Sequence, residues 1–224
     1  MSQRWVCNRL KALGLAANGY GTSASRLKRS MAASSATAIR RLKEARPTVE
    51  LVFPVESGPP VGSLCGYLLF AGLCRADWPI HGETAYQVLG IGNRLLVRCP
   101  EDRVPALLGG KRRIRVTRET VVFGDPFSCS PQPSRRLESR LVVVKNATDA
   151  PAMSLAVRAR LDALAVDGGP TIEIGNRGVL RINGKLIVGY AVRIVGLTAR
   201  ASLFVQAKGI GGRQRFGCGV FTPC

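Results

Sequence analysis

The stretch GIGGRQRFGCGVF, residues 209–221, combines five glycines with Arg213 and Arg215. It follows a helical pattern and stands where the last strand of a domain is expected. Glycine allows φ > 0 and a close approach of the backbone to a ligand. Consecutive N–H groups in such a loop can bind an anion, and the two arginines add charge. We therefore expect an anion-binding loop at Gly209, Gly211 and Gly212; the alternative is a β-bulge in a crowded strand.

The chain upstream of this loop contains strand and helix patterns in a repeating order. The first half has strand patterns at 48–55, 94–100 and 111–124 (a strand pair or one bent strand), and helical patterns at 62–75 and 101–110. The second half has a strand pattern at 140–146, a helical pattern at 150–166, two or three strands with N-R-G and N-G turns at 171–196, and a helical pattern at 197–209.

Each half is interpreted as a β-α-β-β-α-β unit, the ferredoxin-like arrangement of an antiparallel sheet with helices on one face. The segment 125–139 is rich in Pro and Ser and is expected to be the linker. The sequence thus predicts an α+β fold with tandem ferredoxin-like domains at 48–124 and 140–224. Paired modules of this kind form clefts, and many of them bind RNA.

Residues 1–47 form a separate, strongly basic segment. Ten Lys and Arg residues face a single acid, Glu44, which gives a net charge of +9. The segment reads as helical and has few large apolar residues, so we expect a basic helical arm on a nucleic acid rather than a core helix.

The whole chain is basic as well, with 33 Lys and Arg against 14 Asp and Glu and a net charge of +19. Such an excess predicts a polyanionic partner, and nucleic acid is favoured over an acidic membrane because no basic amphipathic helix with a bulky apolar face stands out. No stretch of about 18 uncharged apolar residues predicts a membrane span, and the first residues do not resemble a secretory signal.

Seven cysteines are scattered through the chain without a C-x-x-C pair. This spacing predicts neither a zinc site nor a redox motif. We expect reduced, mostly buried thiols in a cytoplasmic protein, and no cofactor.

The C-terminal stretch GLTARASLFVQAKGIGGRQRFGCGVFTP, residues 196–223, resembles the glycine-rich loop of the RAMP proteins of CRISPR systems. Within them it is similar to the endoribonucleases that cut CRISPR precursor RNA in its repeats. A fainter similarity extends over residues 48–223, through VELVFPV, CGYLLFAGL and NGKLIVGYAVRIVGLTARASL. The resemblance implies tandem ferredoxin-like domains, binding of the repeat hairpin, and cleavage at its 3′ side without metal. It also implies attack by the 2′-OH, a 2′,3′-cyclic phosphate product, and retention of that product with other subunits of an effector complex.

The chain departs from the family pattern at the expected catalytic histidine. Leu64 and Cys65 stand where the family carries Asp and His, and Cys65 is expected to be a buried thiol. His81 is the single histidine of the chain and lies in a loop pattern. It is either a surface or structural residue or a catalyst that has moved.

Arginines offer a second route, because a cluster of them can stabilise the phosphorane and hold the strand in line for attack. The members of the family in type IV CRISPR systems are associated with such a site and with a helical N-terminal finger. The resulting candidates for catalysis are Arg26, Arg41, Arg213 and Arg215, with His81 as the alternative.

The residues expected to contact RNA come from the arm, the strand pair, the linker and the glycine-rich loop. They are Arg29, Arg40, Lys43, Arg112, Arg113, Arg115, Arg118, Arg135, Arg136, Lys208, Gly209, Gly211, Gly212, Arg213 and Arg215. Two competing interpretations remain: a non-catalytic subunit that holds the guide hairpin, favoured by the missing Asp-His pair, and a basic RNA-binding protein unrelated to CRISPR systems.

Overall fold

The structure of the chain is a computed structural model, and it describes residues 48–80, 86–164, 166 and 168–224. The predicted arm and His81 lie outside these residues. Within them, no helix is long and apolar enough to cross a membrane.

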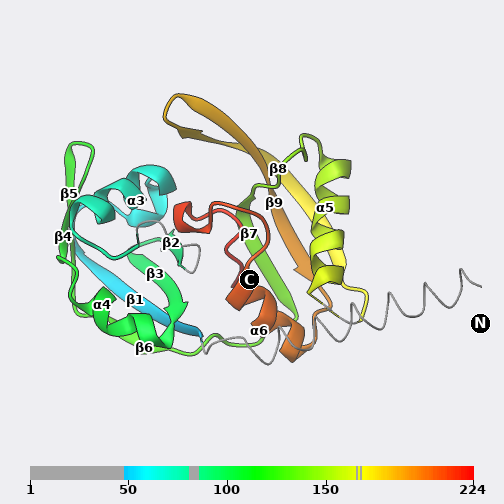
Figure 1. Ribbon diagram of the computed structural model, residues 1–224, viewed down its shortest axis with the longest axis horizontal. Helices are drawn as coiled ribbons and strands as arrows, with labels where there is room; N and C mark the ends of the chain where they lie inside the picture. Colours follow the sequence, from blue (N-terminus) through cyan, green and yellow to red (C-terminus); the bar gives the residue numbers. More distant parts are fainter. Residues whose placement is uncertain (1–47, 81–85, 165, 167) are drawn as a thin grey trace, which may run out of the picture. The chain divides into compact units, whose positions relative to one another are not determined.

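The N-terminal half is built on a twisted antiparallel sheet (Figure 1). Its central strands follow the order β2-β3-β1-β5-β4, with β6 paired to β1. The elements are β1 (Thr48–Ser57), η1 (Val61–Ser63), α3 (Gly66–Arg75), β2 (Gln87–Ile91), β3 (Arg94–Pro100), η2 (Glu101–Arg103), α4 (Val104–Leu108), β4 (Arg113–Val116), β5 (Glu119–Phe123) and β6 (Phe127–Cys129). The order β2-β3-β1-β5 is that of a ferredoxin-like sheet, to which β4 adds an edge strand and β6 a short further strand.

A single apolar core supports this half. Phe53 from β1 is fully buried and its ring contacts those of Trp78 and Phe123, with centroids 4.8 and 6.4 Å away. Leu73 from α3 and Leu107 from α4 join the same core. Both helices therefore cover one face of the sheet, as the pattern of the sequence predicts.

The C-terminal half repeats the arrangement with a four-stranded antiparallel sheet of order β10-β7-β9-β8 (Figure 1). Its elements are β7 (Arg136–Val142), α5 (Ala150–Ala163), β8 (Thr171–Ile182), β9 (Lys185–Val195), α6 (Ala199–Lys208), η3 (Gln214–Phe216) and β10 (Thr222–Pro223). The Asp149 carboxylate caps α5 by accepting from the N–H of Ala152 at 2.7 Å, and the Thr198 hydroxyl caps α6 in the same way. The prediction of tandem ferredoxin-like domains is confirmed.

Several local expectations were wrong. The predicted linker 125–139 contains strand β6, paired with β1, and the first residues of β7. Strand β2 was not predicted, and α3 begins at Gly66 rather than at residue 62. The N-R-G sequence is a register shift inside β8, not a turn. For β6 and β7, pairing with strands remote in the sequence overrides the local pattern, whereas α3 starts late because the 3-10 turn η1 precedes it.

The closing strand also differs from expectation. Only Thr222 and Pro223 pair with β7 as β10, and most of residues 209–221 form a loop around η3. Positive φ angles at Gly209, Gly211 and Gly219 prevent a regular strand there.

Candidate functional site

The glycine-rich loop is fixed to the body of the C-terminal domain by its own backbone. The N–H of Gly209 donates to the carbonyl of Val205 at 2.8 Å, that of Gly212 to Val143 at 3.0 Å, and that of Gly219 to Leu141 at 2.7 Å. Donors that are engaged with protein carbonyls cannot also hold an anion. The expected nest is therefore not formed by Gly209 and Gly212 in this conformation.

The glycines of the loop are required by close packing. A Cβ on Gly219 would lie 2.0 Å from the carbonyl oxygen of Ile210, and one on Gly211 would lie 2.4 Å from that of Val143. Both residues also have positive φ, at 65° and 86°. Gly212 differs, because its Cβ would meet nothing within 4 Å. The loop thus uses glycine chiefly to fold tightly upon itself and on β7.

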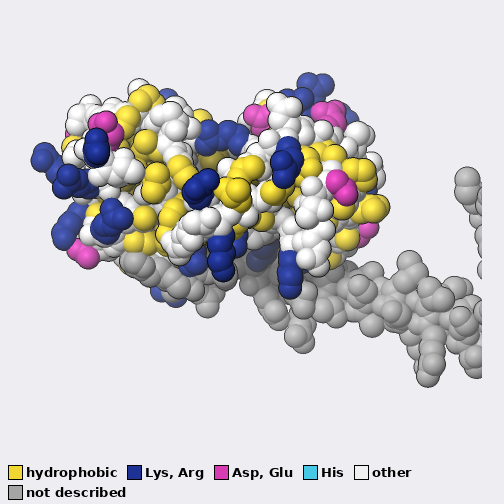
Figure 2. Space-filling model, turned by 90° about the horizontal axis from the view of Figure 1, so that it is seen from above, with side chains coloured by type: hydrophobic (Ala, Val, Ile, Leu, Met, Phe, Trp, Pro, Cys, Tyr) yellow, Lys and Arg dark blue, Asp and Glu magenta, His cyan; other side chains and the backbone are white. Residues whose placement is uncertain are grey.

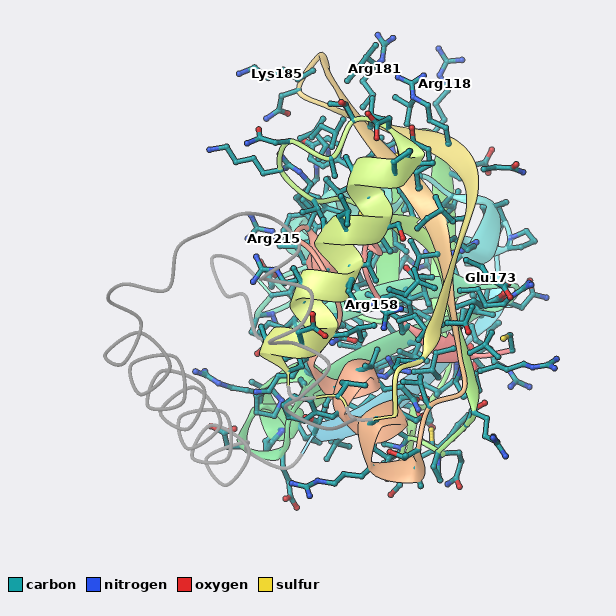
Figure 3. All side chains as sticks on the ribbon, turned by 90° about the vertical axis from the view of Figure 1, so that its right-hand side faces the viewer. Arg118, Arg158, Glu173, Arg181, Lys185 and Arg215 are labelled. Atoms are coloured by element: carbon teal, nitrogen blue, oxygen red, sulfur yellow. The ribbon has the colours of Figure 1, made fainter. Side chains whose placement is uncertain are left out.

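The arginines of the loop occupy different environments. Arg213 is exposed and has the left-handed φ of 65°, and its carbonyl accepts from the N–H groups of Phe216 and Cys218. The guanidinium carbon of Arg215 lies 5.2 Å from the ring centroids of both Phe70 and Phe216. Cation–π contacts with these two rings orient the side chain of Arg215, which is labelled in Figure 3.

Helix α3 brings a tyrosine to the same place. The Tyr67 ring packs edge-on against Phe216 at 5.5 Å, and its hydroxyl donates to Oδ1 of Asn183 at 2.5 Å. Asn183 lies in the N-G turn of the β8–β9 hairpin, with φ of 48°. A Cβ on Gly66 would lie 2.0 Å from the carbonyl oxygen of Phe216, so α3 and the loop are in direct contact. Arg215 and Tyr67 therefore pack on the same Phe216 ring, and Asn183 joins them through the Tyr67 hydroxyl.

Sequence reasoning missed Tyr67 and Asn183 as site residues. Tyr67 lies two residues after the position where the family carries histidine, and Asn183 was noted only as part of a turn. The pairing could not be inferred because it joins residues that are 116 positions apart.

Cys65 is exposed, which corrects the expectation of a buried thiol. It is the residue before α3, and its backbone is extended. Cys218 is the buried thiol of this region, at 1% exposure. Burial raises the pKa of Cys218 to about 12, although the positive charge of Arg213 acts in the opposite direction.

A second basic surface lies on the strand pair β4–β5. Arg113 and Arg115 are exposed while Ile114 and Val116 are buried, so the two arginines share the solvent face of the edge strand. Arg118 is exposed in the turn that follows. The expected RNA contacts at these three positions are thus accessible.

Arg112 has a different role from its neighbours. Its guanidinium carbon lies 5.1 Å from the ring centroid of Phe53, and Nη2 donates to the carbonyl of Leu108 at 3.3 Å. Arg112 is half-buried and packs on the N-terminal core instead of presenting its charge to a ligand.

Further basic residues lie on the surface of the C-terminal half. Arg135, Arg136 and Lys208 are exposed as expected. The β8–β9 hairpin adds basic residues that the sequence reasoning did not select, and Arg181 and Lys185 project from its free end (Figure 3). On the face seen in Figure 2, Lys and Arg side chains occur in several groups and Asp and Glu are fewer.

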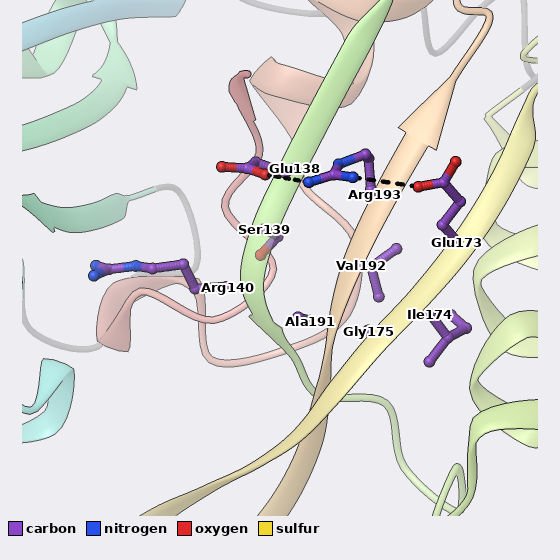
Figure 4. A pocket seen from close by; sticks show the side chains of 9 residues that line it. All are labelled: Glu138, Ser139, Arg140, Glu173, Ile174, Gly175, Ala191, Val192 and Arg193. Atoms are coloured by element: carbon purple, nitrogen blue, oxygen red, sulfur yellow. Dashed lines mark hydrogen bonds and ion pairs between the residues drawn. The ribbon is translucent and has the colours of Figure 1, made fainter.

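The open face of the C-terminal sheet carries charges of both signs. A hollow of about 300 Å³ on this face is lined by residues of β7, β8 and β9. There Arg193 lies between Glu138 and Glu173, with 3.5 Å to each carboxylate (Figure 4). The hydrogen bond to Glu138 raises the pKa of Arg193. The two carboxylates offset the positive charges of Arg193 and Arg140 on this face, which weakens its attraction for a phosphate.

Two ferredoxin-like domains with a glycine-rich loop between the last helix and the last strand define the class of RAMP proteins. The family described as Cas6 Crispr matches residues 49–224. A CRISPR-associated endonuclease Cas6 of Myxococcus xanthus (strain DK1622) is 34% identical over 190 residues, which cover 78% of this chain and 81% of the relative. The chain therefore belongs to the Cas6 family.

Solved structures support the same fold. A CRISPR associated protein Cas6 aligns with 79% of this chain and 98% of its own length, at 11% identity and a TM-score of 0.51. An RAMP protein binding different RNA substrates covers 78% of this chain and 98% of its own, at 12% identity and a TM-score of 0.51.

We predict that substitution of Gly219 by Ala destabilises the protein, since the added Cβ meets a backbone oxygen and the residue keeps a positive φ. The left-handed conformation alone costs about 1–2 kcal/mol for a residue with a Cβ. Gly212→Ala is the matched control and is expected to leave the free energy of unfolding unchanged. Urea denaturation of both variants measures the difference, and equal stability would contradict the packing role of Gly219.

We also predict that Cys65 is alkylated rapidly by iodoacetamide in the native protein at pH 8, whereas Cys218 is not. The raised pKa of Cys218 keeps it protonated until the pH approaches about 12, and only the thiolate reacts. Peptide mapping by mass spectrometry after a short pulse identifies the labelled residues. Labelling of Cys218 at the rate of Cys65 would show that the loop is open in solution.

Proposed function

We propose that this protein is a metal-independent endoribonuclease that binds the hairpin of the CRISPR repeat and cleaves the precursor RNA on its 3′ side. The observation that carries the proposal is the junction of loop and helix, where Arg215 is held by Phe70 and Phe216 next to Tyr67. Membership of the Cas6 family and the name of the Myxococcus relative, an endonuclease, support it.

Cleavage by the RNA's own 2′-OH requires little from the protein. The 2′-oxygen attacks the adjacent phosphorus, the bond from phosphorus to the 5′-oxygen breaks, and a 2′,3′-cyclic phosphate and a 5′-hydroxyl result. A base takes the proton of the 2′-OH, an acid gives one to the leaving oxygen, and positive charge stabilises the phosphorane. No oxidant, cofactor or metal enters this balance.

The described residues supply part of this chemistry. Arg213 is free to move to a phosphate, while Arg215 is already oriented by two rings. The Tyr67 hydroxyl can donate to the leaving oxygen once it exchanges its bond to Asn183 for one to the RNA. Arg26, Arg41 and His81 remain proposed catalytic residues outside the described part of the chain.

Binding is proposed to depend on the accessible basic residues. Arg113, Arg115 and Arg118 form one group on the N-terminal half, and Arg135, Arg136 and Lys208 a second on the C-terminal half. Contacts of this type hold an RNA hairpin through its phosphates and 2′-hydroxyls. We propose further that the cleaved RNA stays bound, as a component of a complex with other CRISPR subunits in the cytoplasm.

The alternative is a subunit that holds the guide hairpin and does not cut. It is favoured by Leu64 and Cys65, which replace the Asp and His of the family pattern.

Cleavage of a labelled repeat RNA in EDTA decides between the two. Wild type is expected to cut, and RNA with a 2′-deoxy sugar at the cut is expected to survive. Loss of one arginine that stabilises the phosphorane costs about 2–4 kcal/mol, so Arg213→Ala and Arg215→Ala are expected to slow the single-turnover rate by about 10²–10³. Arg41→Ala and His81→Ala, tested in parallel, distinguish an arginine site from a displaced histidine.

Arg160→Ala is the matched control, since it removes an exposed arginine in the last turn of α5, outside the glycine-rich loop. Tight binding without any cut by wild type would establish the non-catalytic subunit instead. Loss of activity in His81→Ala alone would transfer the catalytic role from the arginines to the histidine.

The salt dependence of RNA affinity tests the proposed contacts. For Arg115→Ala we predict that the slope of log Kd against log salt falls by about 0.7–0.9, the value for one lost phosphate contact. Arg112→Ala is expected to leave the slope unchanged, because its guanidinium packs on Phe53. Fluorescence anisotropy of a 2′-deoxy substituted hairpin between 50 and 200 mM salt, about the range over which such contacts weaken markedly, measures both slopes. Equal slopes in wild type and Arg115→Ala would remove Arg115 from the interface.

A further inference from the structure

Arg98 on β3 is a charged side chain with almost no access to water. Only 1% of its surface is exposed. Its Nε donates to Oε2 of Glu50 at 2.7 Å, and Nη1 donates to Oε1 of Gln87 at 3.3 Å. These partners belong to the neighbouring strands β1 and β2, so one side of the guanidinium is fixed within the N-terminal sheet.

The other acceptors of Arg98 belong to the C-terminal half. Nη1 also donates to the carbonyl of Phe221 at 2.6 Å and to that of Gln206 at 3.2 Å, and Nη2 lies 3.5 Å from Oε1 of Gln206. Gln206 is in the last turn of α6, and Phe221 directly precedes β10. One guanidinium therefore binds the chain just before and just after the glycine-rich loop.

A second bond supports the same segment. Nε2 of Gln87 donates to the carbonyl of Ala207 at 2.9 Å, next to the Gln206 carbonyl that Arg98 binds. Gln87 and Gln206 are both buried, at 2% and 1% exposure. The entrance to the loop is thus held to β2 and β3 of the N-terminal sheet by two side chains.

This polar network borders the apolar cores of both domains. Val97 and Cys99, on either side of Arg98 in β3, belong to the N-terminal core, and Phe221, whose carbonyl Arg98 binds, belongs to the C-terminal core. A buried ion pair adds little net stability compared with apolar residues of the same volume, but its geometry is highly specific. The planar fork of arginine can reach the Glu50 carboxylate and two backbone carbonyls at once, whereas a lysine ammonium cannot span them.

We propose that Arg98 is a positioning residue for RNA cleavage: it fixes both ends of the glycine-rich loop to the N-terminal sheet and thereby places the loop, which carries Arg213 and Arg215, against α3. The inference rests on the proposed function, because it assigns these arginines to the reacting phosphate. This positioning role gives a reason for burying the charge of Arg98 in a protein that already carries an excess of positive charge.

Substitution of Arg98 by Lys tests this role, with Arg94→Lys, an exposed arginine at the start of the same strand, as the matched control. Arg98→Lys is expected to slow single-turnover cleavage at saturating RNA at least about tenfold, equivalent to 1.4 kcal/mol. The Kd for the 2′-deoxy substituted hairpin is expected to change by no more than about twofold, because most phosphate contacts persist. Arg94→Lys is expected to match wild type in both.

Hydrogen exchange gives a readout that does not depend on activity. In Arg98→Lys, the amides of Gly212 and Gly219, which anchor the loop, are expected to exchange faster, whereas those of the β8–β9 ladder keep their wild-type rates. If Arg98→Lys does not fold, Gln87→Met replaces it. This variant loses the hydrogen bond to Ala207 and keeps the ion pair between Arg98 and Glu50. The loop amides are again expected to exchange faster than in wild type, but by a smaller factor.

The outcomes separate the inference from the proposed function. Equal cleavage and equal loop exchange in Arg98→Lys and wild type would overturn the positioning role. Faster exchange throughout the β8–β9 ladder would also overturn it, by showing that Arg98 is an ordinary core residue. If wild type does not cleave while the loop amides of Arg98→Lys alone exchange faster, the proposed function fails and Arg98 still positions the loop.

Discussion

The guanidinium of Arg98 joins two ferredoxin-like domains that each have a complete apolar core. Its hydrogen bonds to Glu50, Gln206 and Phe221 link the N-terminal sheet to the chain on both sides of the glycine-rich loop. A second arginine connects the halves in the reverse sense. Arg140 lies on β7 of the C-terminal half and donates to the carbonyls of Gly62 and Gly90 in the N-terminal half. Charged donors meeting backbone carbonyls give the junction directional contacts that apolar packing alone does not supply. The placement of the glycine-rich loop against α3 follows from these bonds.

The loop itself shows how one sequence feature can serve a different purpose from the one it suggests. Its glycines allow the chain to pass within contact distance of its own carbonyls and of β7. The tight fold leaves Arg213 at an exposed left-handed position and directs Arg215 onto Phe70 and Phe216. The amides of Gly209 and Gly212 serve the loop's own structure, so the proposed contacts to an anion fall to the arginine side chains that the loop presents.

Much of the architecture could be predicted from local patterns, because strand alternation, helix caps and the Asn183–Gly184 turn are encoded by neighbouring residues. The strands β2 and β6 escaped prediction, since short segments become strands only through a distant partner. The candidate site could be predicted from the sequence only in part. Arg213 and Arg215 stand out by their glycine context, but the inward turn of Arg112, the burial of Arg98 and the pairing of Tyr67 with Asn183 depend on contacts between remote segments. The arm arginines and His81 lie outside the described residues, so their roles stay predictions.

The row of Glu138, Arg193 and Glu173 on the open sheet has a consequence for association kinetics. A polyanion that diffuses toward a protein of net charge +19 is attracted from every side, and most first encounters have the wrong orientation. On this face Glu138 and Glu173 offset the charges of Arg140 and Arg193, so it attracts a polyanion less strongly than faces whose arginines have no carboxylate beside them. Such local neutralisation biases the orientation of first encounters before any contact forms.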